Sequence, residues 1–188
     1  MAASLSLHSP SADAPDRRAF LKALSRGMGG AALAASTMPT LGCASASSDE
    51  TLGVALVGLG NYATGQLAPA LQETTRCELT GIVTGTPSKA DTWTQKYDVP
   101  DENVYDYATY DRIADNDDID IVYVVLPNGM HAEYTMRAAE AGKHVLCEKP
   151  MATSVQECKN MIAACEKAGV KLSVGYRLHF APHHQRVM

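Results

Sequence analysis

Short apolar runs alternate with longer segments of helical spacing through most of this chain, from about residue 47 to residue 175. The apolar runs predict buried strands at 54–57, 78–84, 119–126, 144–147 and 171–175, with a shorter one near 104–105. Apolar residues three and four positions apart predict helices at 67–71, 88–97, 132–141 and 155–168. A further helical stretch after the short strand is predicted to extend through Ile113. Strands joined by helices of this size form right-handed crossovers. The pattern therefore predicts an α/β fold, a doubly wound parallel sheet with helices on both faces.

The first predicted strand ends in a glycine turn, Gly-Leu-Gly-Asn-Tyr-Ala at residues 58–63, which leads directly into a helix. This Gly-x-Gly-x-x-Ala pattern is a variant of the dinucleotide-binding fingerprint of the Rossmann fold. Its glycines would allow a sharp turn and a close approach to a pyrophosphate, whose charge would lie at the helix N-terminus. The alternative is a glycine turn between any strand and helix. The cofactor-binding candidates in the turn are Gly58, Leu59, Gly60, Asn61 and Tyr62.

The end of the second predicted strand indicates which nicotinamide cofactor would bind. An acidic residue about 20 positions after the glycines binds the ribose 2′-OH of NAD. This chain has Thr84 in that place, and its next carboxylate, Asp91, falls inside the following helix. Hydroxyl groups and the Lys89 cation would suit a 2′-phosphate, so Thr84, Gly85 and Lys89 are cofactor-binding candidates and NADP is favoured over NAD. The alternative is an ordinary polar loop with a solvated lysine.

Composition excludes several other classes of protein. The net charge of −5 over 188 residues leaves no basic footprint for nucleic acid. The chain has no run of about 18 apolar residues, so we expect no permanent membrane span. Its length allows one ordinary domain with an appendage. The cysteines have no metal-ligand spacing, so we expect no metal site and expect these thiols to fill the core: Cys43, Cys77, Cys147, Cys158 and Cys165.

Residues 1–46 are expected to be an export signal. Residues 17–22, Arg-Arg-Ala-Phe-Leu-Lys, resemble the core of a twin-arginine signal, although Asp16 replaces the usual Ser or Thr. An Ala/Gly-rich segment at 27–41 and an A-x-A cleavage site at 44–46 follow. The signal predicts a periplasmic protein.

Two alternatives to a cleaved signal stay open. The segment could form an amphipathic N-terminal helix with two surface arginines. Cys43 could also carry a lipid, although Thr40 stands where a lipoprotein box has Leu.

Motifs at the ends of the later strands carry a family resemblance. Pro127-Asn128 with His131, the Glu-Lys-Pro segment at 148–150 and the Gly-Tyr-Arg segment at 175–177 follow the glycine turn in order. Together they resemble the glucose-fructose oxidoreductase / inositol dehydrogenase (Gfo/Idh/MocA) family, and most of all its glucose-fructose oxidoreductase branch. The resemblance covers roughly residues 51–188.

The resemblance implies roles for these residues. Lys149 would be the catalytic residue, placed near the nicotinamide to move a proton from the reacting hydroxyl as hydride leaves carbon. Glu148 would hold or tune that amine. The implied cofactor contacts also include Pro127, Asn128, His131, Glu148, Lys149, Tyr176 and Arg177. For His131 the alternative is an ordinary residue at a helix start.

The same resemblance implies a chain organisation. Residues 47–175 would be the NAD(P)-binding Rossmann domain, and residues 176–188 the start of a truncated second domain that members of the family use to cover the nicotinamide. The expected function is NADP-dependent hydride transfer to and from a sugar or polyol, in a protein that could be a homo-oligomer. Two alternatives remain, a non-catalytic NAD(P)-binding module and a methyltransferase using S-adenosylmethionine. The methyltransferase would want an acidic residue at Thr84 and has no use for the Glu-Lys-Pro segment.

Overall fold

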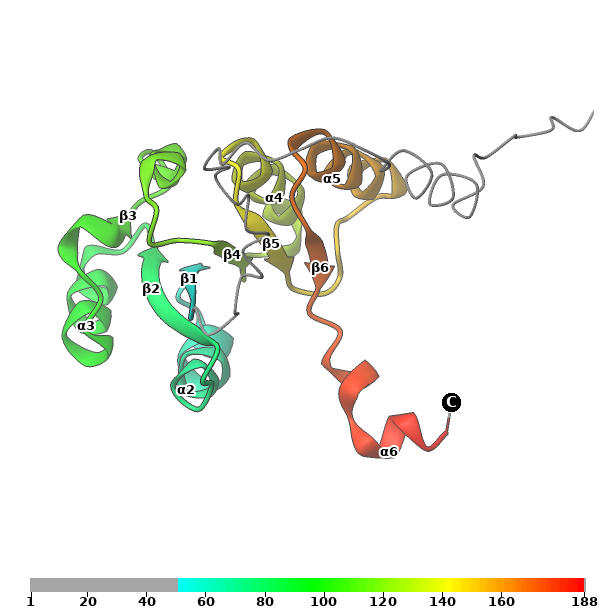
Figure 1. Cartoon of the computed structure of the whole chain (residues 1–188), viewed down its shortest axis with the longest axis horizontal. Helices are drawn as coiled ribbons and strands as arrows, with labels where there is room; N and C mark the ends of the chain where they lie inside the picture. The colour runs from blue at the N-terminus through cyan, green and yellow to red at the C-terminus, as the bar shows by residue number, and fades with distance from the viewer. Residues whose placement is uncertain (1–50, 188) are drawn as a thin grey trace, which may run out of the picture. The chain divides into compact units, whose positions relative to one another are not determined.

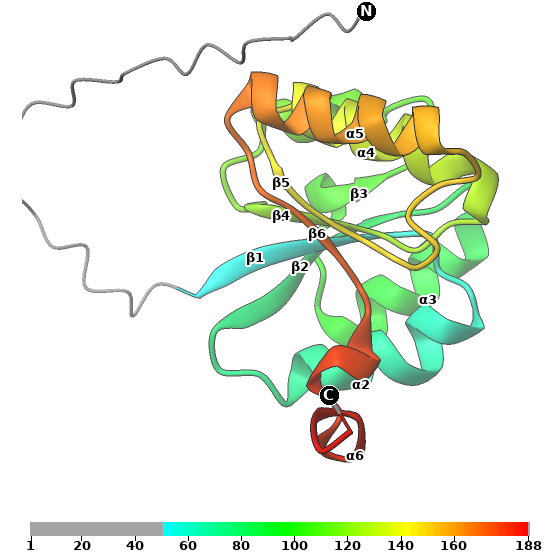
Figure 2. The same ribbon diagram turned by 90° about the vertical axis from the view of Figure 1, so that its right-hand side faces the viewer.

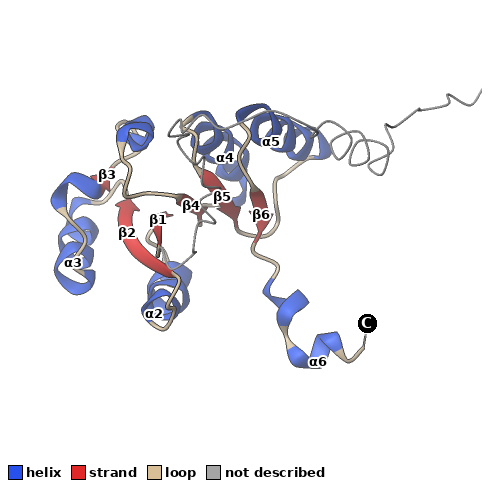
Figure 3. Ribbon diagram, in the orientation of Figure 1, coloured by secondary structure: helices blue, strands red, loops and turns tan. Residues whose placement is uncertain are grey.

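A six-stranded parallel sheet forms the centre of the structure, a computed structural model that describes residues 51–187 of the chain (Figures 1 and 3). The strand order is β3-β2-β1-β4-β5-β6, and every neighbouring pair is parallel. The strands are β1 (Leu52–Val57), β2 (Cys77–Val83), β3 (Val104–Tyr105), β4 (Ile121–Val124), β5 (His144–Cys147) and β6 (Leu172–Val174). The α-helices between them are α2 (Ala68–Gln72), α3 (Pro87–Tyr97), α4 (His131–Glu140) and α5 (Val155–Ala168), and α6 (Pro182–Gln185) follows β6. The predicted doubly wound Rossmann sheet is confirmed.

The strand order places a switch point beside β1. The chain moves outward from β1 to β2 and β3, then returns to add β4, β5 and β6 on the other side of β1. Val57, the last residue of β1, pairs with the last residues of both neighbours, Val83 and Val124. The loops that leave these three strands therefore begin side by side, where sheets of this kind bind ligands.

Helices cover both faces of the sheet, α4 and α5 on one side and α2 and α3 on the other (Figure 2). Successive residues of β1 alternate between the two resulting cores. Ala55 and Val57 pack with the α4 and α5 side, whereas Val54 and Leu56 pack with Trp93 of α3 and its neighbours. Burial on both faces explains why the strands read as continuous apolar runs in the sequence.

The helix after the glycine turn differs from a regular α-helix. Its first part, Ala63–Leu67, is a π-helix, and α2 continues it. Pro69 lies in the first turn of α2 and has no N–H to donate to the carbonyl four residues earlier. The hydrogen-bond ladder is therefore interrupted here, which the apolar spacing alone did not reveal.

Other boundaries follow the predictions closely. β5 and α5 have the predicted limits, whereas β4 is shorter than predicted and the helical segment through Ile113 is a 3₁₀ helix, Tyr110–Asp115. The cap of α5 is complete, because Ser154 Oγ accepts a hydrogen bond from Glu157 N at 3.2 Å and Gly169 ends the helix with φ 71°. Cys147 and Cys165 are buried in the core as expected, whereas Cys77 and Cys158 are only half-buried and Cys43 lies outside the described residues. The predicted export signal lies outside the described residues.

Candidate functional site

The glycine turn after β1 has the geometry that its residue types predict. Gly58 has φ 97°, and a Cβ there would lie 2.6 Å from Val125 O, so only glycine fits. A Cβ on Gly60 would have no heavy atom of the described chain within 4 Å, so protein packing does not account for this glycine. Ala63 is fully buried and packs against the core. The turn thus leaves its backbone accessible at Gly60, at the start of the helix.

A cavity of about 370 Å³ lies beside this turn, and we call it the glycine-turn cavity. Its walls come from four strand ends: the turn after β1, the loop after β2, Tyr107 after β3 and the Val125–Pro127 segment after β4. Lys89 lines it and donates from Nζ to Leu59 O at 3.0 Å, which ties α3 to the glycine turn. Thr84 is only 7% exposed, and its Oγ1 accepts a hydrogen bond from Thr86 N at 3.2 Å. The Thr84 hydroxyl therefore shapes the loop, and Lys89 brings the positive charge.

Tyr107 is a wall of this cavity that sequence reasoning missed. It follows the two-residue strand β3, and its ring carbons lie 3.0 and 3.2 Å from where a Cβ on Gly85 would stand. Gly85 is thus needed for the close approach of the Tyr107 ring. An aromatic residue two positions after a short strand was the available signal, but its role could be assigned only once β3 was known to pair with β2.

A second cavity, of about 430 Å³, lies at the ends of β5 and β6. Glu148 and Lys149 line it from the β5 side, residues 175–178 from the β6 side, and Tyr62 from the glycine turn. We call it the Glu-Lys cavity. Gly60 lines the first cavity and Tyr62 the second, so one turn borders both.

Glu148 is buried and its carboxylate is held at both oxygens. Oε1 accepts a hydrogen bond from Tyr123 Oη at 2.7 Å, and Oε2 accepts one from the backbone N–H of Lys149 at 3.1 Å. Burial, followed by the hydrogen bond to Glu148, raises the pKa of Tyr123. Burial and then the charge of Glu148 also raise the pKa of Tyr62, whereas the charge of Arg177 lowers it. Both phenols therefore stay protonated and can donate at neutral pH.

The Glu148 carboxylate fixes the main chain of Lys149. The family resemblance had instead implied that Glu148 holds or tunes the side-chain amine of Lys149. Lys149 itself is exposed at the cavity, and its peptide bond to Pro150 is cis. Tyr123, the second anchor of Glu148, was predicted only as part of a buried strand. A Cβ on Gly175 would lie 2.8 Å from Glu148 Oε1 and 3.1 Å from Tyr123 Oη, so this glycine makes room for the pair.

His131 is 1% exposed, and both of its ring nitrogens face backbone carbonyls. Nδ1 lies 2.8 Å from Pro150 O and Nε2 lies 2.8 Å from Leu126 O. Both contacts are hydrogen bonds at once when each nitrogen carries a proton. His131, which was predicted to contact the cofactor, therefore joins the loop after β4 to the loop that carries Lys149.

The structure brings most of the predicted site residues to the two cavities. The glycine-turn cavity collects Gly58, Leu59, Gly60, Thr84, Gly85, Lys89 and Pro127. The Glu-Lys cavity collects Tyr62, Glu148, Lys149, Tyr176 and Arg177. Neither cavity is lined by Asn61, Asn128 or His131. Within residues 51–187 there is no group of three or more His, Cys, Asp or Glu side chains that could hold a metal ion. No helix in the same range is long and apolar enough to cross a membrane.

Comparisons with known proteins agree with this geometry. Residues 52–176 match the model of the Gfo/Idh/MocA family, described as an oxidoreductase family with an NAD-binding Rossmann fold. The chain is 33% identical over 141 residues to D-xylose 1-dehydrogenase [NADP(+)] of Haloarcula marismortui, covering 73% of this chain and 38% of the relative. It is 31% identical over 131 residues to dTDP-3,4-didehydro-2,6-dideoxy-alpha-D-glucose 3-reductase of Saccharopolyspora spinosa, covering 69% and 38%.

Solved structures show the same relationship. Aldose-aldose oxidoreductase from Caulobacter crescentus, complexed with glycerol, superposes with a TM-score of 0.70 and 51% identity over 71% of this chain and 40% of that one. The 3-ketoreductase KijD10 of Actinomadura kijaniata, in complex with NADP, gives a TM-score of 0.66 and 30% identity over 73% and 42%. The chain therefore spans about two fifths of the length of these relatives. With its glycine turn, its Rossmann sheet and a family match across residues 52–176, the chain belongs to the Gfo/Idh/MocA family of oxidoreductases.

Proposed function

We propose that this chain is the nucleotide-binding part of an NADP-dependent oxidoreductase that moves hydride between a sugar C–OH and a nicotinamide. The observation that carries the proposal is the pair of cavities at one end of the sheet. They share the turn after β1, and each offers one lysine, Lys89 in the first and Lys149 in the second. A dinucleotide has two halves joined by a pyrophosphate, and these cavities offer a place for each half.

The adenosine half would occupy the glycine-turn cavity. Lys89 would meet a 2′-phosphate there, and among the described residues no carboxylate lines the cavity to bind an unmodified ribose. The Tyr107 ring offers a flat apolar surface to a base. The names of the D-xylose 1-dehydrogenase and the KijD10 complex both carry NADP, which supports the same choice. The pyrophosphate would lie over Gly60, at the N–H groups of the helix start.

The Glu-Lys cavity would receive the nicotinamide and the sugar. When bound, NADP supplies the carbon that accepts or returns hydride. Lys149 would hydrogen-bond the reacting sugar oxygen and take or return its proton, because its exposed amine lines the cavity. Glu148 would keep the Lys149 backbone in place through its 3.1 Å hydrogen bond, while Tyr123 holds the other carboxylate oxygen. Tyr176 and Arg177 would give further polar contacts to sugar hydroxyls.

Two parts of the proposal concern the protein beyond this site. We propose that the protein acts in the periplasm after twin-arginine export, which transports folded proteins and so would allow the cofactor to be loaded first. We also propose that residues from about 176 begin a second domain that covers the nicotinamide. Water exclusion would require such a cover, because Tyr176 is 59% exposed and Phe180 is 74% exposed.

The test is sugar-driven reduction of NADP by a protein that carries this chain together with a complete second domain, because that domain would cover the nicotinamide. We expect that aldoses added to the NADP-loaded protein raise the nicotinamide absorbance, and that Lys149→Ala keeps NADP but lowers turnover by about 100-fold or more. Lys159→Ala, a change of an exposed lysine on α5, should leave turnover unchanged. NADP binding without any sugar-driven change would contradict the oxidoreductase proposal and indicate a nucleotide-binding module. Unchanged turnover in Lys149→Ala would remove that residue from the reaction.

A further inference from the structure

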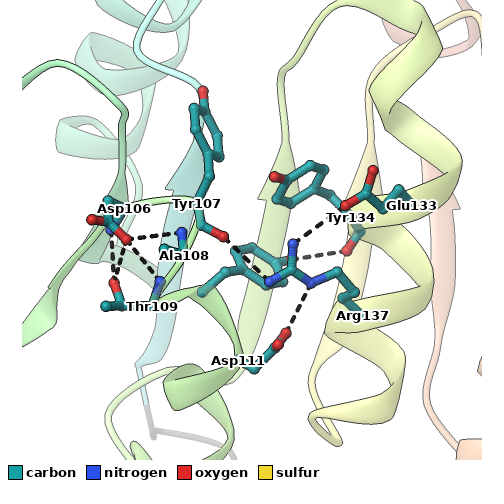
Figure 4. Close-up of polar contacts among 9 residues, drawn as sticks. Asp106, Tyr107, Ala108, Thr109, Asp111, Glu133, Tyr134 and Arg137 are labelled. Carbon is teal, nitrogen blue, oxygen red and sulfur yellow. Dashed lines mark hydrogen bonds and ion pairs between the residues drawn. The ribbon is translucent and has the colours of Figure 1, made fainter.

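Arg137 of α4 is the centre of a polar and aromatic cluster outside the two cavities (Figure 4). Its guanidinium lies 4.8 Å from the ring centre of Tyr110 and 4.9 Å from that of Tyr134. Nε donates to Asp111 Oδ1 at 2.9 Å, and Nη1 donates to Glu133 Oε1 at 3.4 Å. The side chain is 22% exposed, so two aromatic faces and two carboxylates fix it in one orientation.

The remaining edge of the guanidinium reaches the loop after β3. Nη2 donates to the backbone carbonyl of Tyr107 at 3.3 Å. The Tyr107 ring also packs edge-on against Tyr134, with ring centres 5.5 Å apart and planes at 68°. Thus α4 holds Tyr107 twice, by its carbonyl through Arg137 and by its ring through Tyr134 (Figure 4).

The loop that carries Tyr107 is also fixed by its own hydrogen bonds. Asp106 Oδ1 accepts hydrogen bonds from Ala108 N at 2.9 Å and from Thr109 N at 2.7 Å, and Thr109 Oγ1 accepts one from Asp106 N at 3.0 Å. The hydrogen bonds that Thr109 donates from its backbone N–H and from Oγ1 to the carboxylate contribute most to lowering the pKa of Asp106. This loop is thus closed on itself, and Arg137 and Tyr134 connect its Tyr107 to α4.

We propose that Arg137 is a positioning residue for nucleotide binding, which acts by holding Tyr107 as the wall of the glycine-turn cavity. The inference rests on the proposed function, because it assumes that the adenosine half of NADP occupies that cavity. Arg137 lies thirty positions after Tyr107 and lines neither of the two cavities of the site. Its effect on the nucleotide therefore passes through Tyr107.

A double-mutant cycle in the full chain tests this route, with NADPH and adenosine 2′,5′-bisphosphate as probes. Tyr107→Ala should weaken the binding of both probes about tenfold, as the loss of one stacked base contact does. Arg137→Lys keeps the charge but cannot make three hydrogen bonds in one plane, and it should weaken both probes about threefold. The double variant should stay at about tenfold, because Tyr107 is no longer there to be positioned.

The control is Glu133→Gln, which alters the 3.4 Å contact and leaves the bond from Arg137 to Tyr107 intact. It should leave both affinities unchanged. A loss of about thirtyfold in the double variant would show that Arg137 acts independently of Tyr107 and would overturn the inference. Equal affinities of the unchanged chain and Tyr107→Ala would also overturn it, while leaving NADP binding itself in place. No binding by the unchanged chain would instead overturn the proposed function together with the inference.

Discussion

Gly175 shows how one residue without a side chain supports the site. It leaves room for the hydrogen bond between Glu148 and Tyr123, which in turn holds the backbone of Lys149. Gly175→Ala would place a carbon 2.8 Å from Glu148 Oε1, so the buried carboxylate would have to shift. We expect a loss of about 1–3 kcal/mol in the free energy of unfolding, measured by urea denaturation.

The matched control for that substitution is Gly129→Ala, since a Cβ there meets nothing within 4 Å in the described chain. Its stability should stay within about 0.5 kcal/mol of the unchanged protein. Equal effects of the two substitutions would mean that the contact with Glu148 does not constrain Gly175.

At the scale of elements, His131 connects two loops that the sequence separates. Because its nitrogens lie 2.8 Å from Leu126 O and Pro150 O, it links the end of β4 to the segment after β5. His131→Ala would leave two carbonyls in the protein interior without this partner. We expect a loss of about 2–4 kcal/mol in unfolding free energy, measured by thermal or urea denaturation.

His183→Ala is the control for this prediction, because His183 is an exposed residue of the short helix α6. It should change the stability by less than about 0.5 kcal/mol. A similarly small effect of His131→Ala would contradict the role given to its contacts with the two carbonyls.

The elements also show where sequence reasoning succeeds. β5 and α5 match their predicted limits, and for α5 local features mark both ends: a cap at Ser154 and a glycine at 169 with positive φ. The π-helix at Ala63–Leu67 was not predicted, because apolar spacing does not distinguish a π-helix from an α-helix. In the sequence the short strand β3 is only a pair of apolar residues. Its parallel pairing with β2 identifies it as a strand of the sheet.

For the molecule as a whole, the order of strands and helices was sufficient to predict the sheet, since crossovers between parallel strands have one hand. The motif residues were found because they follow strands directly. Tyr107, Tyr123 and Arg137 were missed because their roles depend on contacts between distant segments. Tyr123 reads as a core residue until β4 and β5 are known to be neighbours, and only then does its hydroxyl meet Glu148.

The central claim, that the two cavities form one NADP site, has a direct test in nucleotide affinity. The full chain is titrated with NADP⁺ and with NAD⁺, alongside Lys89→Ala and a control on the same helix, Lys96→Ala. We predict that the unchanged chain binds NADP⁺ at least about tenfold more tightly than NAD⁺. Lys89→Ala should remove most of that preference, while Lys96→Ala should leave it unchanged. Equal affinity for the two nucleotides, or an equal loss of both in Lys89→Ala, would contradict the assignment of the 2′-phosphate to the glycine-turn cavity.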